Sequence, residues 1–269
     1  MHYQEDHEPV GPSVLEQLAA GRPILSLGVR FARTGDIARM ASGAGYQVIW
    51  IDLEHSSMSV DCAAQIAATA TDLGMAAWVR VPEREYGVIG RLLDSGATGI
   101  ISPKVETADE ARLAAAACRF PPRGQRSSIA LLPQSGFAKA SAAELMRKSN
   151  DGTVLQILLE SAKGVANADE IAAVDGVDVL GMGMNDLSAD LGCPGDLRNP
   201  KIAAACAEIA AAAARHGKIA VAGGIADPAH FVELLGSGFA PLVFAGIDTE
   251  VLASGLVRRV ADWRDRFST

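Results

Sequence analysis

The chain has 269 residues, of which 49% are hydrophobic and 21% are charged, and its formal net charge is −8. This length and apolar content suit one large α/β domain. The acidic balance argues against a nucleic-acid or anionic-membrane partner, because both of these carry negative charge themselves. The apolar runs are all shorter than the roughly 18–20 residues that a membrane-spanning helix requires.

The cysteines and the N-terminal residues indicate a compartment. The four cysteines are scattered along the chain without CxxC spacing: Cys62, Cys118, Cys193 and Cys206. This spacing disfavours a zinc site or a disulfide framework, and the polar N-terminal residues do not have a signal-peptide pattern. We therefore expect a cytoplasmic protein in which residues 1–269 form a single domain and residues 1–14 are a flexible segment.

Short apolar segments typical of buried strands alternate along the chain with amphipathic, Ala-rich segments typical of helices. In chain order, the expected strands cover residues 23–29, 47–52, 75–81, 98–102, 153–160, 177–183, 218–224 and 241–246. The expected helices cover residues 36–45, 60–74, 86–96, 107–120, 162–174, 200–217, 228–238 and 248–267. Several of these helices end at a glycine, a common C-terminal residue because it readily adopts left-handed backbone angles.

The alternation of strands and helices predicts the fold class. The strands are almost continuously apolar, as expected for strands buried on both faces of a parallel sheet. Eight βα units in about 250 residues is the pattern of a (β/α)8 TIM barrel. A doubly wound sheet is the alternative, but it usually has fewer strands, and the first strand here is not followed by GxGxxG.

Polar and charged residues follow the ends of the expected strands. In chain order they are Asp52, Glu54, His55, Arg80, Lys104, Glu160, Asn185, Asp186 and Asp248. In a TIM barrel the C-terminal ends of the strands surround the active site. We therefore expect these residues to meet at one mouth of the barrel.

Two of these residues suggest a metal site. Glu160 and Asp186 end neighbouring strands, and two carboxylates with room for water suit a hard divalent cation such as Mg²⁺ or Mn²⁺. The alternative is that each carboxylate caps a helix or turn. Strand-end position alone does not distinguish these readings.

A histidine and an arginine suggest acid–base chemistry at the same mouth. His55 follows Asp52 by three residues, and a carboxylate bound to one ring nitrogen would make the other a better general base. The alternative is an ordinary loop histidine. Arg80 ends an apolar strand, where an arginine requires an anionic or carbonyl partner. The alternative is a strand-end arginine that pairs with Glu54 or Glu83.

Seven motifs resemble a known family when they are taken in their order over about residues 15–265. They are IDLEH, VRVP, LLDSGATGIISPKVETADEA, FPPRGQRS, LLES, GMNDLSADLG and AGIDT. This ordered set resembles the HpcH/HpaI aldolases of the pyruvate/phosphoenolpyruvate-binding barrel superfamily. The resemblance implies a divalent-metal-dependent (class II) aldolase that cleaves a 4-hydroxy-2-oxo acid to an aldehyde and pyruvate, or a close 2-oxo acid such as hydroxypyruvate.

The resemblance also implies roles for individual residues. Glu160 and Asp186 would bind Mg²⁺, Mn²⁺ or Co²⁺, His55 supported by Asp52 would be the base, and Arg80 would stabilise the oxyanion. Asp94 would help to orient the base across a subunit contact. The substrate carboxylate would be held by the amides of Gly183, Met184, Asn185 and Asp186. The family resemblance implies a homohexamer, a trimer of dimers, in which the last helix, residues 248–267, packs on a neighbour.

Departures from the family pattern fall around the pocket. Leu53 and Leu158 stand where the family often has glycine and glutamine, and the first expected strand runs into LGVRFAR. This places Arg30 and Arg33 near the aldehyde side. Our hypothesis is that Arg30 favours an acidic or hydroxylated aldehyde.

Three other functions compete with a metal-dependent aldolase. Lys104 would be the amine of a Schiff-base aldolase, but Glu160 and Asp186 would then have no role. A citryl- or malyl-CoA type lyase shares the barrel and the metal pair, but generally lacks DxEH at the second strand. The third alternative is a barrel that binds an oxo acid without catalysis.

Overall fold

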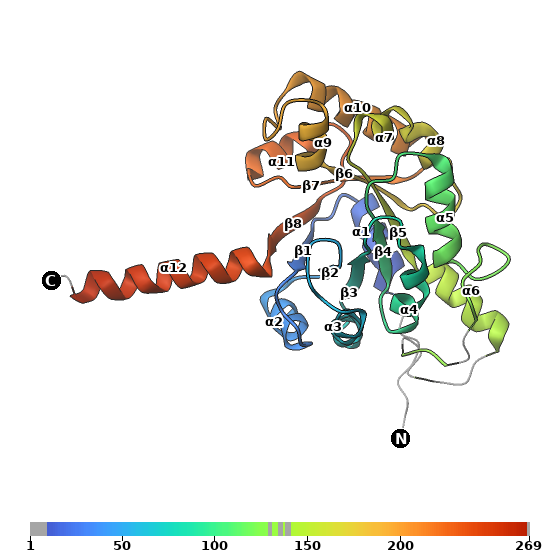
Figure 1. Cartoon of the computed structure of the whole chain (residues 1–269), viewed down its shortest axis with the longest axis horizontal. Helices are drawn as coiled ribbons and strands as arrows, with labels where there is room; N and C mark the ends of the chain where they lie inside the picture. The colour runs from blue at the N-terminus through green and yellow to red at the C-terminus, as the bar shows by residue number, and fades with distance from the viewer. Residues whose placement is uncertain (1–9, 129–130, 134–136, 138–140, 268–269) are drawn as a thin grey trace.

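The computed structural model describes residues 10–128, 131–133, 137 and 141–267, and its centre is a sheet of eight parallel strands (Figure 1). The strands are β1 (Ile24–Val29), β2 (Val48–Asp52), β3 (Ala76–Arg80), β4 (Gly99–Ser102), β5 (Val154–Leu159), β6 (Val179–Gly183), β7 (Ile219–Gly223) and β8 (Leu242–Ile247). Each lies within one of the predicted strand segments or extends it by one residue.

The sheet curls into a nearly closed barrel. The strand order is β7-β6-β5-β4-β3-β2-β1-β8, so every neighbour along the chain from β1 to β7 is also a neighbour in space. Between the two ends of this order, the amide of Ala240 donates to the carbonyl of Ala220 at 2.7 Å. The prediction of a (β/α)8 barrel is confirmed.

Helices surround the barrel. They are α2 (Asp36–Ala44), α3 (Val60–Asp72), α4 (Ile89–Asp94), α5 (Ala108–Cys118), α6 (Ala142–Gly152), α7 (Ala162–Ala166), α8 (Ala168–Ala172), α9 (Met184–Asp190), α10 (Pro200–Arg215) and α11 (Pro228–Leu235). The expected helix 162–174 is divided at Asn167 into α7 and α8, and the expected helix 86–96 begins with a 3₁₀ turn, η1 (Tyr86–Val88). Thr107 and Glu110 form a capping box at the start of α5.

The alternation of side chains along each strand positions the site. Val48 and Trp50 of β2 and Ala76 and Trp78 of β3 belong to the hydrophobic cluster inside the barrel, whereas Ile49, Ile51, Ala77 and Val79 belong to the cluster beneath the helices. Successive residues of a strand point to opposite faces. The next inward positions at the C-terminal ends are therefore Asp52 on β2 and Arg80 on β3. Val154 and Leu158 of β5 lead to Glu160 in the same way.

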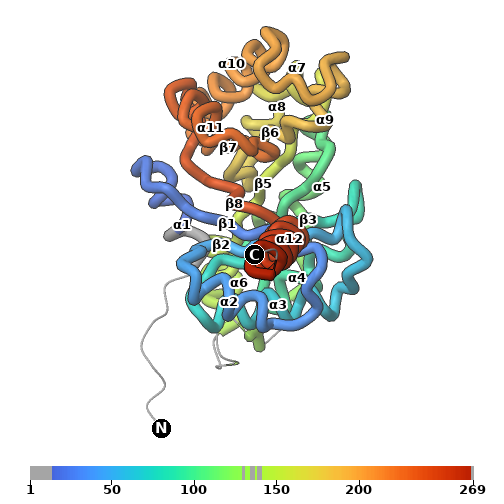
Figure 2. The backbone as a smooth tube through the Cα atoms, turned by 90° about the vertical axis from the view of Figure 1, so that its left-hand side faces the viewer, coloured from blue at the N-terminus to red at the C-terminus, as the bar shows by residue number. Residues whose placement is uncertain are grey.

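The two terminal helices differ in their packing. Val14 and Leu18 of α1 (Val10–Ala19) join the interior cluster with Ile24 and Leu242, the first residues of β1 and β8, so α1 closes the barrel at the end opposite the mouth. Part of the segment 1–14, expected to be flexible, is thus helical from Val10, while residues 1–9 lie outside the described residues. At the other terminus, α12 (Asp248–Phe267) extends away from the barrel (Figures 1 and 2). Across the described ranges, the helices are all too short or too polar to span a lipid bilayer.

Candidate active site

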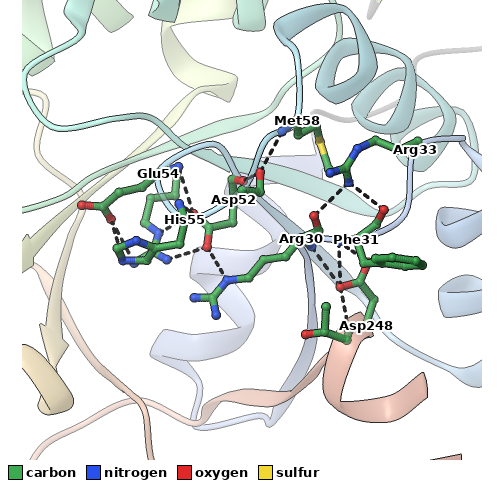
Figure 3. A network of polar contacts seen from close by, with 11 residues as sticks. Arg30, Phe31, Arg33, Asp52, Glu54, His55, Met58 and Asp248 are labelled. Atoms are coloured by element: carbon green, nitrogen blue, oxygen red, sulfur yellow. Dashed lines mark hydrogen bonds and ion pairs between the residues drawn. The ribbon is translucent and has the colours of Figure 1, made fainter. Parts of the chain in front are cut away.

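Asp52 is the centre of a buried network at the barrel mouth (Figure 3). Its side chain is fully buried, and its Oδ1 accepts hydrogen bonds from Arg80 Nε at 3.0 Å and from the amides of Glu54 and His55 at 3.1 and 3.2 Å. Its Oδ2 accepts from Arg30 Nε and Arg80 Nη2, both at 2.6 Å. Burial raises the pKa of Asp52, but these hydrogen bonds and the charge of Arg80 outweigh it and hold the pKa below its usual value.

The contacts of Asp52 correct one prediction. The carboxylate was expected to bind a ring nitrogen of His55, yet it reaches His55 only through the backbone amide. Within the described part of the chain, both oxygens of Asp52 are instead occupied by the two arginines and two amides. Asp52 therefore holds Arg30 and Arg80, and the loop after β2, in position.

All three guanidinium nitrogens of Arg80 are paired with carboxylates. Besides its two bonds to Asp52, its Nη1 lies 3.2 Å from Glu54 Oε2, and its side chain is only 9% exposed. Its guanidinium also lies over the ring of Trp50, 5.4 Å from the centroid. Burial lowers the pKa of Arg80, but its bonds and charges with Asp52 and Glu54 outweigh burial and raise the pKa above its usual value. Arg80 is therefore a fixed positive charge.

Glu54 is a residue that the sequence placed at the mouth without a catalytic role, except as a possible partner of Arg80. Its side chain is 9% exposed, and its Oε2 lies 3.6 Å from His55 Nε2. The same oxygen is buried and makes no hydrogen bond among the described residues. Of the carboxylates described, Glu54 is the one beside the His55 ring. The ring is 48% exposed at the mouth, where a substrate proton would be accessible to it.

Glu160 and Asp186 face a cavity of about 350 Å³ at the ends of β4, β5 and β6. The amide of Lys104 donates to Glu160 Oε2 at 3.1 Å. Gly183 leaves room for this side chain, because a Cβ there would lie 2.3 Å from Glu160 Oε1. Burial raises the pKa of Glu160 to about 7, and the negative charges of Glu54 and Asp186 add to the effect. Glu160 is thus a buried carboxylate in a negative surrounding.

These two carboxylates fit a divalent cation. Among the described residues there is no cluster of three or more His, Cys, Asp or Glu side chains arranged to hold a metal. A pair of carboxylates beside a cavity nevertheless matches a cation such as Mg²⁺, which typically takes one or two carboxylates and completes its coordination with water and substrate oxygens. A cation at this position would offset the charge of Glu160.

The predicted carboxylate-binding amides lie at the start of α9, which begins at Met184 directly after β6. Gly183 precedes the helix, and no side chain caps its first turn. Asn185 and Asp186 lie on the solvent-facing side of this turn, and the Asn185 side chain lies close to Gly224 at the end of β7. These residues adjoin Glu160, and this position is compatible with binding of the substrate carboxylate by their amides.

Three predicted residues have other surroundings. Asp94 ends α4, before β4 begins, and accepts a 2.6 Å hydrogen bond from Arg126, so a single chain does not bring it to His55. Arg33 does not enter the mouth, because its Nη1 donates to the carbonyls of Arg30, Phe31 and Ala32. Lys104 lies at the rim of the cavity, with Nζ 3.8 Å from Glu83 Oε2.

Comparisons with known proteins agree with this geometry. The model of the HpcH/HpaI aldolase/citrate lyase family matches residues 32–253. The chain is 38% identical over 205 residues to a 4-hydroxy-4-methyl-2-oxoglutarate aldolase of Hapsidospora irregularis, covering 75% of each chain. It is 33% identical over 262 residues to a hydroxypyruvate/pyruvate aldolase of Deinococcus radiodurans, covering 96% of this chain and 92% of the other.

A solved structure gives the same result. The crystal structure of an HpcH/HpaI aldolase from Desulfitobacterium hafniense DCB-2 superposes with a TM-score of 0.85 at 28% identity, over 93% of this chain and 95% of the other. The resemblance inferred from the ordered motifs is confirmed: the chain belongs to the HpcH/HpaI aldolase/citrate lyase family.

Proposed function

We propose that the chain is a divalent-metal-dependent aldolase that cleaves a 4-hydroxy-2-oxo acid to an aldehyde and pyruvate, or a close 2-oxo acid such as hydroxypyruvate, and that also catalyses the reverse addition. The relatives named above are aldolases, which are carbon–carbon lyases. Their names favour this reaction over a CoA-ester lyase. Mg²⁺ and Mn²⁺ are the proposed cations, with Co²⁺ as a further candidate.

The observation that carries this proposal is the unequal distribution of charge at the mouth. Glu160 is buried next to two other carboxylates, and no cation from the described residues pairs with it. Arg80, whose charge acts on Glu160, is fixed by its ion pairs with Asp52 and Glu54. A carboxylate pair open to a cavity, beside a rigid arginine and an accessible histidine, suits stabilisation of a negative charge on a bound oxo acid.

Each residue of the proposed site has its own role in the retro-aldol reaction. When bound at Glu160 and Asp186, a divalent cation supplies Lewis-acid polarisation of the oxo group. The amides at the start of α9 hold the substrate carboxylate, and Arg80 adds positive charge where the oxo oxygen becomes negative. His55 removes the proton from the 4-hydroxyl, and Glu54 stabilises the imidazolium that forms. The C3–C4 bond breaks, and its electron pair remains on the pyruvate fragment.

This assignment is tested by pyruvate release from a racemic 4-hydroxy-2-oxo acid after EDTA treatment. Release that returns with Mn²⁺, and that is lost in His55→Ala, supports the proposal. A covalent adduct trapped by borohydride from EDTA-treated enzyme and pyruvate would favour Lys104 chemistry instead. Cleavage of citryl- or malyl-CoA in place of the oxo acid would favour the CoA-ester lyase.

The proposed assembly is a homohexamer, a trimer of dimers, in which α12 packs on a neighbouring copy. The support is the exposed apolar surface of α12, whose only buried residue is Asp248. Its exposed apolar residues are Val251, Leu252, Leu256, Val257, Val260, Trp263 and Phe267. Burying such a stripe is favourable at roughly 25 cal/mol per Å². The contact of Asp94 with the His55 region of another copy belongs to the same proposal.

Light scattering coupled to gel filtration measures the assembly directly. A mass of six chains is the expected result, and Trp263→Glu should reduce it. Asp262→Lys, a charge change in the same turn, is the matched control and should leave the mass unchanged. A monomeric wild-type chain at micromolar concentration would contradict the proposed assembly.

A further inference from the structure

Arg30 and Arg80 share one carboxylate but differ in what remains of their hydrogen-bonding capacity. All three guanidinium nitrogens of Arg80 face Asp52 or Glu54. Arg30 uses only Nε, on Asp52 Oδ2 at 2.6 Å, and no other carboxylate of the described residues pairs with it. Its terminal Nη1 and Nη2 point away from Asp52 (Figure 3), and its side chain is 31% exposed. One edge of this guanidinium is therefore available to a ligand.

The free edge of Arg30 is held in a defined orientation. Its guanidinium carbon lies 5.9 Å from the centroid of the Trp50 ring. Trp50 reaches this position because residue 28 is a glycine, where a Cβ would lie 2.6 Å from the Trp50 ring. A guanidinium fixed by Asp52 at Nε and by an aromatic ring at one side presents Nη1 and Nη2 as a fork, which matches a carboxylate.

The backbone of Arg30 is fixed as well. Asp248, the first residue of α12, is buried and accepts hydrogen bonds from the amide of Arg30 at 3.0 Å and from that of Ala32 at 2.7 Å. The amide of Phe31 donates to the same carboxylate at 2.9 Å. Arg33 binds the carbonyls of this turn from the other side, with Nη2 3.2 Å from Ser57 Oγ. The turn after β1 is thus tied to α12, and only one of its two arginines faces the mouth.

Arg30 also lies away from the proposed cation site. Val29 is opposite Ile51, and Asp52 is opposite Arg80, so the three charged residues follow one another across the ends of β1, β2 and β3. Arg30 follows β1 and Glu160 follows β5, which are four strands apart in the order of eight, so the two residues lie on opposite sides of the barrel mouth. In Figure 3, the backbone of Arg30 lies on the other side of Asp52 from Glu54 and His55, and its guanidinium reaches back to the Asp52 carboxylate. A substrate held by its oxo-acid end near Glu160 would extend its other end toward Arg30.

We infer that Arg30 is a specificity-determining residue that binds a second carboxylate, attached to C4 of the 4-hydroxy-2-oxo acid. The inference rests on the proposed aldolase function and narrows it: the substrate is a dicarboxylate, and the carbonyl product is itself a 2-oxo acid, not a neutral aldehyde. Cleavage of the C3–C4 bond converts the C4 hydroxyl to a carbonyl and leaves the second carboxylate on that product. The proton from the hydroxyl passes to the base, and the electron pair passes to C3.

Two substrates that differ at one group test this inference. The probes are 4-hydroxy-2-oxoglutarate, with a carboxylate on C4, and 4-hydroxy-2-oxopentanoate, with a methyl group there. The readout is the ratio of their kcat/KM values for pyruvate release with Mn²⁺-loaded enzyme, because a general loss of activity cancels in the ratio. The wild-type chain should prefer the dicarboxylate. Arg30→Gln should reduce that preference by about 10-fold to 100-fold, as expected for losing a charged hydrogen-bonded pair.

Two further variants separate specificity from structure. Arg33→Gln removes an arginine of the same turn that does not face the mouth, so both rates should change together and the ratio should stay at the wild-type value. Arg30→Lys keeps the charge but loses the fork, and an intermediate ratio is expected. A wild-type ratio near one, or an Arg30→Gln ratio equal to that of the wild type, would overturn the inference. Failure of the wild type to cleave either probe would instead overturn the proposed function, and the inference with it.

Discussion

The two sides of the barrel mouth differ in whether their buried carboxylates are paired with arginines. At the ends of β1, β2 and β3, the carboxylate of Asp52 is fully buried and is bound by two arginines and two amides. At the ends of β5 and β6, Glu160 is also buried, but the negative charges of Glu54 and Asp186 act on it together with the positive charge of Arg80, with which it forms no ion pair. The first side has its charges paired within the chain, whereas on the second side Glu160 forms no ion pair with any of the described residues.

We assign a structural role to the paired carboxylate of Asp52 and a chemical role to the unpaired carboxylate of Glu160. A buried carboxylate that is paired with arginines is held in one ionisation state and gives a rigid arrangement. A buried carboxylate among other carboxylates is unfavourable unless something positive binds there. The side of Glu160 is therefore the side that we assign to the cation and the oxo acid, and the side with paired charges is the frame that carries Arg30 and Arg80.

The largest expected effect comes from breaking the ion pairs of Asp52. Asp52→Ala would leave Arg80 buried with half of its partners lost, and removing one member of a buried ion pair typically costs about 3–5 kcal/mol of unfolding free energy. Urea denaturation measures this loss. Asp151→Ala is the control, because Asp151 is about half exposed and pairs only with surface arginines, so its loss should stay below about 1 kcal/mol. Equal losses of unfolding free energy for the two variants would contradict the stabilising role of the buried Asp52 carboxylate.

Removing the carboxylate of Glu160 should instead raise the unfolding free energy. Glu160→Gln removes a buried carboxylate that has no cation among the described residues, so the metal-free chain should gain roughly 1–2 kcal/mol in unfolding free energy. Adding Mn²⁺ should stabilise the wild type but not the variant, because ligand binding to the native state raises its stability. A metal-free Glu160→Gln chain that is less stable than the wild type would mean that Glu160 is already compensated.

The smallest expected effect is the acid response of Asp52. Its pKa is below the usual value in the folded chain, so its ionised form contributes stability above the ordinary pKa of 3.8. That contribution is lost as the pH falls through the lowered pKa of the folded state. The difference in unfolding free energy between the wild type and Asp52→Asn should therefore be constant near neutral pH and should narrow below about pH 3.8. A difference that narrows already between pH 7 and 5 would contradict a lowered pKa.

The eight βα units were predictable because each expected strand and helix carries its own signal, whereas α1, α6 and α9 were not among the expected helices. Continuous apolar runs such as residues 47–52 and Ala-rich amphipathic segments such as 200–217 are local patterns, and their strict alternation indicates the barrel. The inward position of Asp52, Arg80 and Glu160 follows from the same local alternation. The division of the expected helix 162–174 at Asn167 was not visible, because the pattern of apolar residues continues through it.

The partners within the site were less predictable. The pairing of Asp52 with Arg80 depends on the register between β2 and β3, which a single strand does not reveal, and the nearby His55 seemed the simpler partner. Spacing alone did not separate Arg30 from Arg33, since the turn after β1 points one into the mouth and folds the other onto its own backbone. The proposed role of Asp94 involves another copy of the chain, so no pattern within one chain decides it.

We propose that Glu160 and Asp186 bind a cation that activates an oxo acid. This proposal is tested most directly by following the methyl protons of pyruvate in D₂O by NMR, first with EDTA-treated enzyme and then after adding Mg²⁺, with the diamagnetic ion chosen to keep the signals sharp. This experiment requires no knowledge of the second substrate. The methyl signal should be lost only with the cation present, and it should persist with Glu160→Gln. Exchange that continues at the same rate in EDTA would contradict this proposal.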